Sequence, residues 1–156
     1  LWDETLERLR GDYPEIAADR QHADAAAMNF VRCPERFDVV VASNLCGDLL
    51  TDLGGIIGGG LGLAPSTNTN PERQYPSMFE PVHGSAPDIA GQQKANPIAA
   101  ILSGAMMLDF LGHREAGAAI VSAIERTLAD PAAPRTRDLG GRATTVEVGK
   151  AIAAML

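Results

Sequence analysis

The sequence predicts a domain of the α/β class, and three observations support this. The segment FDVVVA at residues 37–42 is a short apolar run of strand-forming residues, typical of a strand buried on both faces. Residues 97–156 carry three helical patterns, with Pro and capping residues between them. Residues 43–59, directly after the predicted strand, space their apolar side chains as one face of a helix does, at Leu49, Leu50, Leu53, Ile56 and Ile57.

Start and stop signals delimit the other elements before residue 97. Residues 2–10 form an amphipathic helical stretch that Gly11 and Pro14 end, and residues 25–32 form a short helix before Pro34. Residues 58–76 are rich in Gly, Pro and Asn and are predicted to be mostly loop, followed by a short strand, SMFEPV, and a second long loop, HGSAPDIAGQQKAN. Long loops around a short strand are typical of a binding region.

The predicted helices after residue 96 have recognisable ends. Asn96 and Pro97 are suited to the N-cap and first turn of the first helix. The second helix carries an apolar stripe that includes Ile120 and Ile124. Thr144 and Glu147 form a capping-box signature for the third helix.

Composition limits the classes of function. The chain has 156 residues, of which 46% are hydrophobic and only 4% aromatic, so small and aliphatic side chains must fill its core. A net charge of −7 argues against nucleic acid and anionic membranes as partners, because both attract clustered Lys and Arg. Cys33 and Cys46 are interpreted as buried small hydrophobes in a reducing compartment. With no signal peptide or apolar segment long enough to span a bilayer, a cytoplasmic location is expected.

Asp48 and Asp52 are the first candidate for chemistry. Their spacing of four residues places both carboxylates on one helix face, within reach of a single cation. Mg²⁺ and Mn²⁺ prefer such oxygen ligands and keep coordination positions open for substrate. The alternative interpretation is a solvated helix face that carries two like charges.

Three other polar residues have weaker signals. His83 lies in a loop beside small residues that let a flat ligand approach the backbone, although a lone loop histidine is more often a surface residue. Asp24 is suited to an N-cap, and Asn96 has the same explanation. No G-x-G-x-x-G fingerprint of a Rossmann fold follows a strand, so a nucleotide site here is of another type. The residues alone indicate an α/β domain with a candidate divalent-metal site.

Three long segments of the chain carry a resemblance to a known family. The strings SNLCGDLLTDLGG, NTNPERQYPSMFEPVHGSAPDIAG and ANPIAAILSGAMML resemble the isocitrate and isopropylmalate dehydrogenases. The NPER segment and the pair Asp88–Ile89 are most similar to the tartrate and D-malate dehydrogenase branch. The resemblance implies a two-lobed α/β fold of which this chain is the C-terminal half. Residues 1–50 or so are then the end of the dimerisation and substrate lobe, and residues 51–156 belong to the cofactor lobe.

The resemblance also implies a metal site and a homodimer. In the family, three aspartates hold a Mg²⁺ or Mn²⁺ ion that binds the substrate, and the matching positions here are Asp24, Asp48 and Asp52. The family counterpart of Asp24 reaches across the dimer interface into the active site of the partner.

A cofactor loop is the third implication. The matching residues would bind the adenosine half of the cofactor. Because the Asp88 carboxylate accepts hydrogen bonds from ribose hydroxyls and repels the extra phosphate of NADP, the expected cofactor is NAD. The full set of expected cofactor-binding residues is Glu80, His83, Gly84, Ser85, Ala86, Asp88, Ile89 and Asn96.

The activity implied is metal-dependent, NAD-linked oxidation, with decarboxylation, of a small 2-hydroxy dicarboxylate such as tartrate or D-malate. The catalytic lysine and tyrosine and the substrate-binding arginines are expected in an N-terminal half, and the start at Leu1 without Met suggests a partial chain, inactive alone. The alternatives are a 3-isopropylmalate dehydrogenase and a truncated, non-catalytic relative that binds a nucleotide.

Overall fold

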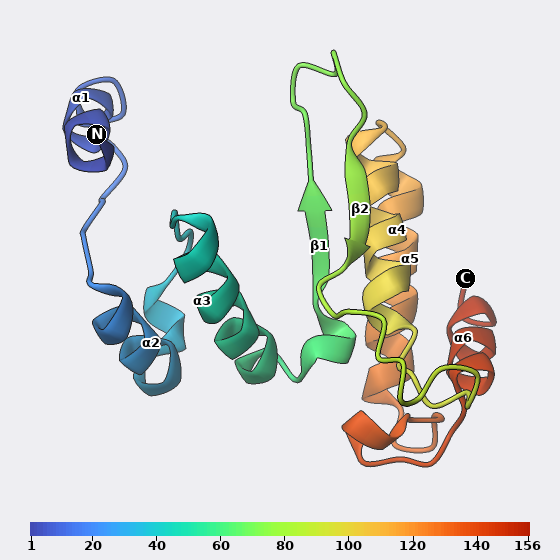
Figure 1. The fold of residues 1–156 in the computed structure, drawn as a ribbon. Coiled ribbons are helices and arrows are strands. Elements are labelled where there is room, and N and C mark those ends of the chain that lie inside the picture. The colour runs from blue at the N-terminus through green and yellow to red at the C-terminus, as the bar shows by residue number, and fades with distance from the viewer. The chain divides into compact units, whose positions relative to one another are not determined.

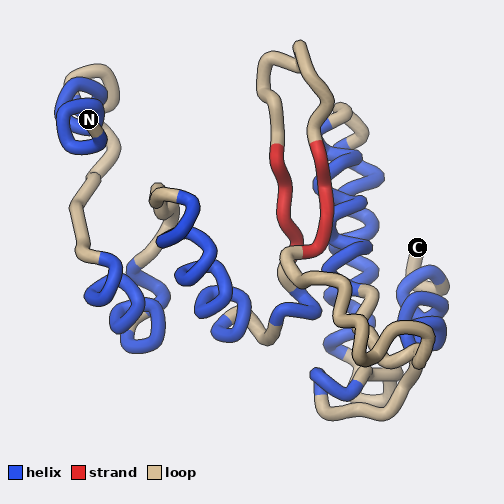
Figure 2. The backbone as a smooth tube through the Cα atoms, viewed as in Figure 1, coloured by secondary structure: helices blue, strands red, loops and turns tan.

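Six α-helices and a two-stranded sheet make up the regular structure of the computed structural model, which describes all 156 residues (Figures 1 and 2). The chain divides into two units, Leu1–Val40 and Val41–Leu156, each of which is described by itself. The assignment of lobes, with a boundary near residue 50, stays a prediction. In chain order the elements are α1 (Trp2–Arg10), α2 (Ala23–Arg32), α3 (Asn44–Ile57), β1 (Pro65–Asn68), β2 (Met78–Pro81), α4 (Ile98–Phe110), α5 (Arg114–Ala129) and α6 (Thr145–Ala153).

The first unit contains α1 and α2. Arg20, in the connection between them, lies 3.4 Å from the carboxylate of Asp3 and also pairs with Glu7, so it ties the connection back to α1. The ring of Phe30 in α2 contacts that of Phe37, which follows the helix, with centroids 4.6 Å apart. Only Ala26 is buried in this unit, so most of its apolar side chains are open to solvent.

The core of the second unit lies where α4, α5 and α6 meet. Small residues let α4 and α5 approach closely: a Cβ placed on Gly117 would lie 2.9 Å from the carbonyl oxygen of Ala105. The expectation of a core built from small and aliphatic side chains is therefore confirmed. The buried residues of this cluster are Ile98, Ala123, Ile124, Val148 and Ile152.

Strands β1 and β2 form an antiparallel pair that lies alongside α4 (Figure 1). Their register runs from Pro65 opposite Pro81 to Asn68 opposite Met78. Phe79 of β2 packs against Phe110 of α4, with ring centroids 5.6 Å apart, which fixes the hairpin on the helix. The C-terminal end of β2 therefore leads the chain from a fixed position into the loop that follows.

The predicted strand at residues 37–42 is wrong for this chain. These residues form no strand, and Val39 and Val41 are 85% and 79% exposed. A strand requires a partner with which to exchange backbone hydrogen bonds, and the only sheet present contains β1 and β2 alone. The apolar pattern was recognised correctly, but no neighbouring strand is available to pair with it.

Three further expectations need correction. Residues 65–68, assigned to a loop, form β1, because pairing with β2 overrides the low strand propensity of Pro and Asn. The N-cap of α2 is His22, and Asp24 lies in the first helical turn. Cys33 and Cys46 are free and half-buried, not fully buried.

The predicted starts of α4 and α6 have different outcomes: the N-cap of α4 is Pro97 rather than Asn96, whereas the capping box of α6 is confirmed. The Asn96 side-chain oxygen accepts a hydrogen bond of 3.0 Å from the backbone N–H of Ile98, the first residue of α4. Thr144 and Glu147 form the full capping box at the start of α6. None of the helices combines the length and the apolar character needed to cross a membrane.

Candidate functional site

Helix α3 carries two of the candidate metal ligands. Asp48 and Asp52 are both exposed, and neither forms an ion pair. Asp48 accepts one long side-chain hydrogen bond, 3.4 Å, from Asn44 at the start of the helix. Two free carboxylates one helical turn apart suit a hard divalent cation, which prefers oxygen ligands and tolerates bound water.

The structure shows no third metal-binding side chain beside Asp48 and Asp52. No group of three or more His, Cys, Asp or Glu side chains could hold a metal ion. Asp24 belongs to the other structural unit, where its carboxylate accepts a hydrogen bond of 2.8 Å from the backbone N–H of Ala25. A site that uses α3 alone therefore supplies two carboxylates and needs the remaining ligands from elsewhere.

The predicted cofactor loop begins on β2 and continues over an exposed turn. Glu80 lies on β2 opposite Ser66, and its side chain is exposed. The His83 ring is half-buried, with its Nδ1 atom 3.0 Å from the carbonyl oxygen of Gly84. Ser85 is exposed, and a Cβ built on Gly84 would meet no other atom within 4 Å. The small residues thus leave open space in which a flat ligand could reach the backbone.

Asp88 and Ile89 occupy the turn that follows. The Asp88 carboxylate is exposed and forms no ion pair, while its backbone oxygen accepts a 2.7 Å hydrogen bond from the Gln92 side chain. Ile89 is half-buried and donates its backbone N–H to the carbonyl oxygen of Ala86. Ala86 itself adopts a φ of 41°, which is uncommon for a residue other than glycine. The carboxylate is therefore free to accept hydrogen bonds from a ligand.

Asn96 differs from the other predicted loop residues because it is only 7% exposed. Its amide nitrogen donates a 2.9 Å hydrogen bond to the Asp138 carboxylate, and its oxygen accepts the N–H of Ile98. Its side chain is thus engaged within the protein.

Sequence reasoning missed Asp138 and the residue that packs against it, Gly62. A Cβ placed on Gly62 would lie 2.7 Å from the Asp138 carboxylate and 2.8 Å from the Asn96 Cβ, so only glycine leaves room for this contact. The available signal was the pair Gly140–Gly141 directly after Asp138 and Leu139, which indicates a tight turn. Nothing local in the sequence indicated that this turn meets the end of the predicted cofactor loop.

A groove of about 560 Å³ lies between the hairpin and helices α4 and α5. Its wall is mostly apolar and includes Phe79, Leu102 and Val121, with an ion pair of 3.6 Å between Asp109 and Arg114. None of the predicted site residues lines it. The groove is therefore separate from both candidate ligand clusters.

The curated relatives match 90% or more of this chain, and the chain spans less than half of their length. D-malate dehydrogenase [decarboxylating] from Escherichia coli (strain K12) is 56% identical over 97% of this chain and 43% of its own. A probable tartrate dehydrogenase/decarboxylase from Bacillus subtilis (strain 168) is 52% identical over 100% of this chain and 44% of its own. A 3-isopropylmalate dehydrogenase from Frankia casuarinae is also 52% identical, over 90% of this chain and 42% of its own.

Solved structures agree with this result. The crystal structure of isocitrate dehydrogenase from Methylococcus capsulatus superposes with a TM-score of 0.91 at 39% identity, over 97% of this chain and 44% of that one. The fold is thus the α/β fold of the isocitrate dehydrogenase class. The family model for isocitrate/isopropylmalate dehydrogenase matches residues 1–152. The chain belongs to the isocitrate/isopropylmalate dehydrogenase family.

Proposed function

We propose that the protein containing this chain is a metal-dependent, NAD-linked dehydrogenase that oxidises and decarboxylates a small 2-hydroxy dicarboxylate, with D-malate or tartrate as substrate. The observation that carries this proposal is the pair of free carboxylates, Asp48 and Asp52, one turn apart on α3. Family membership and the 56% identity to a D-malate dehydrogenase support the choice of reaction and substrate.

In this proposal Asp48 and Asp52 hold Mg²⁺ or Mn²⁺. When bound, such an ion stabilises negative charge that develops on substrate oxygens. The contribution of the chain is to present two carboxylates with no competing cation and to leave the remaining coordination positions for the substrate and for Asp24. The residues that donate and accept protons lie among those that this chain does not supply.

The exposed faces of α2 and α3 support a homodimer in which Asp24 reaches the partner's site. On α2, Asp24 shares one face with Met28 and Val31, at spacings of four and three residues. On α3, Asp52 shares a face with three apolar residues at the same kind of spacing, and all five of these apolar side chains are more than half exposed. In each helix a metal-binding aspartate therefore lies on an apolar face suited to a subunit interface. The apolar residues on α3 are Leu45, Leu49 and Ile56.

The loop from Glu80 to Asn96 binds the adenosine half of NAD in this proposal. Gly84, Ser85 and Ala86 leave the backbone accessible, and His83 lies two residues after the end of β2. The free Asp88 carboxylate accepts hydrogen bonds from the ribose hydroxyls and repels a 2′-phosphate.

The first test is a rate assay on the full-length protein with Mn²⁺ and NAD, using D-malate, tartrate, 3-isopropylmalate and isocitrate in parallel. We expect NADH formation with D-malate or tartrate, and its loss on addition of EDTA. Asp48→Asn should lower kcat/KM by about a hundredfold or more, since even changes outside the first ligand shell cost 10- to 100-fold. Asp12→Asn, which neutralises another exposed and unpaired aspartate, is the matched control.

The other outcomes of this assay select among the alternatives. Turnover of 3-isopropylmalate alone would support the second candidate, which the 52% identity to the Frankia casuarinae enzyme favours. No turnover of any substrate by purified protein with metal present would point to a non-catalytic relative and contradict the proposal.

A second test concerns the cofactor. Replacing Asp88 by Lys and Ile89 by Tyr removes the repulsion of a 2′-phosphate and adds an attractive charge, so the ratio of kcat/KM for NAD to that for NADP should fall by at least about tenfold. Glu72→Lys, which makes the same charge change on the β1–β2 loop, is the control and should leave the ratio unchanged. An unchanged ratio in the double variant would contradict the assignment of Asp88.

A further inference from the structure

The end of the predicted cofactor loop is held by a segment far along the chain, residues 138–145, which we name the brace. Three hydrogen bonds join them. Asp138 accepts 2.9 Å from the Asn96 amide, the Thr145 backbone N–H donates 3.0 Å to the Gln93 carbonyl, and the Thr145 hydroxyl donates 2.5 Å to the Ala95 carbonyl. All these residues belong to the same structural unit. The brace therefore ties the last residues of the loop to the start of α6.

The contact with Asp138 is closely fitted. Asn96 is buried, and a hydrogen bond from its amide to a carboxylate is stronger than one between neutral groups. Gly62 packs against both Asn96 and Asp138, and there is no space for a Cβ at Gly62 beside either of these side chains. In the brace itself, a Cβ on Gly141 would lie 1.9 Å from the Arg135 carbonyl oxygen, so the turn that presents Asp138 also depends on glycine.

The middle of the loop has no comparable support. Between Gly84 and Gln92 the hydrogen bonds join only residues of the loop itself, such as Ile89 to Ala86 and Gln92 to Asp88. All side chains of this stretch except Ile89 are exposed. Ala86 and Gln93 have positive φ values of 41° and 56°, a conformation that persists only where the surrounding structure imposes it. The position of Asp88 therefore depends on β2 at one end and on the brace at the other.

We propose that Asp138 and Thr145 are positioning residues for the dinucleotide: they hold Gln93–Asn96 and thereby keep the loop with Asp88 in its binding geometry. This inference rests on the proposed assignment of the loop to NAD. A misplaced loop weakens dinucleotide binding without changing the reacting groups. Loss of the brace should therefore raise KM for NAD and leave kcat and KM for the dicarboxylate unchanged.

The experiment uses the full-length protein with Asp138→Ala and Thr145→Val. We expect each variant to raise KM for NAD, and Kd for NADH, by about tenfold. Asp138→Ala removes the hydrogen bond from Asn96 to a charged carboxylate, and Thr145→Val removes the hydrogen bond from the Thr145 hydroxyl to Ala95 that holds the loop. Asp138→Asn and Thr145→Ser keep an acceptor for Asn96 and a hydroxyl for Ala95, so they should restore most of the affinity. Arg142→Ala, an exposed brace residue with no side-chain partner, is the control.

Hydrogen exchange of the protein without cofactor gives a second readout. Amides of Ser85–Gln92 should exchange faster in Thr145→Val than in the control, with α5 unchanged. This variant also serves if Asp138→Ala does not fold, because it removes only one side-chain hydrogen bond.

The outcomes separate the two proposals. Wild-type protein that neither reduces NAD nor binds NADH overturns the loop assignment and the brace with it. Wild-type protein that binds NADH, with KM for NAD in both brace variants equal to that of Arg142→Ala, overturns the brace alone. A rise of both KM values together with a fall in Tm would show that the brace only stabilises the fold.

Discussion

At the scale of single residues, Gly62 is the position where the structure most clearly requires glycine. Gly62→Ala would place a methyl group 2.7 Å from the Asp138 carboxylate, which must then move away from Asn96. We expect a loss of about 1–3 kcal/mol in the free energy of unfolding, the usual cost of overpacking a close contact. Denaturant unfolding of the full-length protein measures this loss.

Gly149→Ala is the matched control for that experiment. Gly149 lies within α6, and a Cβ there would meet no atom within 4 Å. Alanine in a helix interior is favoured over glycine by about 0.5–1 kcal/mol, so this variant should be neutral or more stable. Equal effects of the two substitutions would contradict the close packing around Gly62.

The candidate ligands illustrate what residue-level reasoning can and cannot recover. The spacing of Asp48 and Asp52 was sufficient to place both carboxylates on one exposed helix face. The pairing of Asn96 with Asp138 was not recoverable, because the two residues lie 42 positions apart and neither carries a local pattern that names the other. Contacts of that kind depend on how whole elements pack.

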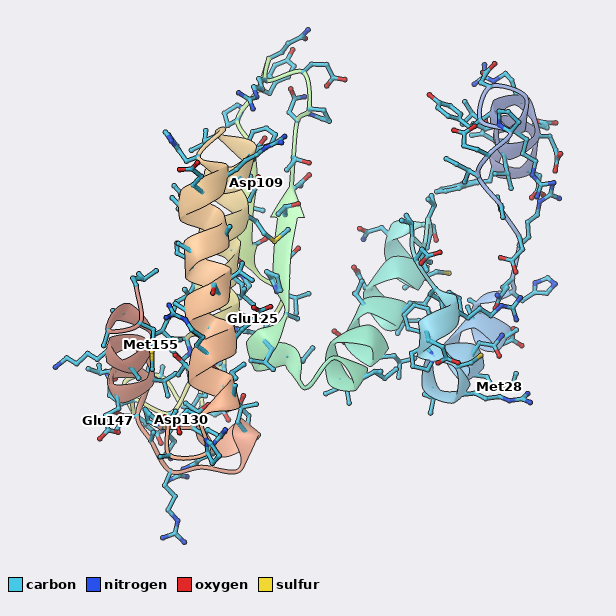
Figure 3. The ribbon with its side chains drawn as sticks, turned by 180° about the vertical axis from the view of Figure 1, so that it is seen from behind. Met28, Asp109, Glu125, Asp130, Glu147 and Met155 are labelled. Atoms are coloured by element: carbon cyan, nitrogen blue, oxygen red, sulfur yellow. The ribbon has the colours of Figure 1, made fainter.

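At the scale of elements, the start of α6 depends on a reciprocal pair of hydrogen bonds. The Glu147 carboxylate accepts a hydrogen bond of 2.7 Å from the Thr144 backbone N–H, and the Glu147 backbone N–H donates one of 3.3 Å to the Thr144 hydroxyl oxygen (Figure 3 labels Glu147 on α6). The Thr144 hydroxyl also lies 2.8 Å from the carboxylate, to which it donates. The backbone hydrogen bond, followed by the hydroxyl, holds the pKa of Glu147 below its usual value of 4.5. A carboxylate whose pKa is lowered by folding stabilises the folded state above its unfolded pKa, and this contribution is lost as the pH falls through the folded pKa.

Glu147→Gln tests this linkage, because glutamine has a similar shape and does not titrate. The wild-type protein should be more stable than the variant at pH 7, and the difference should shrink as the pH falls below the unfolded pKa of a glutamate and through the lowered pKa of Glu147 in the folded state. Thermal unfolding at a series of pH values gives the difference directly. A difference that stays constant from pH 7 to pH 3 would show that the charge of Glu147 does not contribute.

Helices were predicted more successfully than strands for a physical reason. A helix satisfies its backbone hydrogen bonds within one segment, so start signals such as Asn96–Pro97 and Thr144, together with an apolar stripe, are enough to locate α4, α5 and α6 to within a residue or two. A strand exists only through its partner. Pro65–Asn68 became a strand because β2 lies beside it, whereas residues 37–42 have a stronger strand pattern and no partner.

At the scale of the whole molecule, the chain exposes apolar surface that a complete protein of this family has the length to cover. The relatives considered above are more than twice as long as the segment that matches. Val39 and Val41 are 85% and 79% exposed in this chain. They belong to the apolar run at residues 37–42, whose pattern is typical of a strand buried on both faces. We therefore expect residues 37–42 to be a buried strand in the full-length protein, paired with residues outside this chain.

Two substitutions of Val39 with graded polarity decide whether that expectation holds. If Val39 is buried in the full-length protein, Val39→Thr should destabilise it by about 1–2 kcal/mol, because a buried hydroxyl without a partner is costly. Val39→Asp should cost clearly more, since an unpaired charge is harder to bury than a hydroxyl. If Val39 remains as exposed as it is in this chain, both variants should stay within about 0.5 kcal/mol of wild type, as surface substitutions usually do. The order of the two losses, read from the unfolding midpoints at a common denaturant slope, distinguishes a strand that pairs with the rest of the full-length protein from an exposed segment.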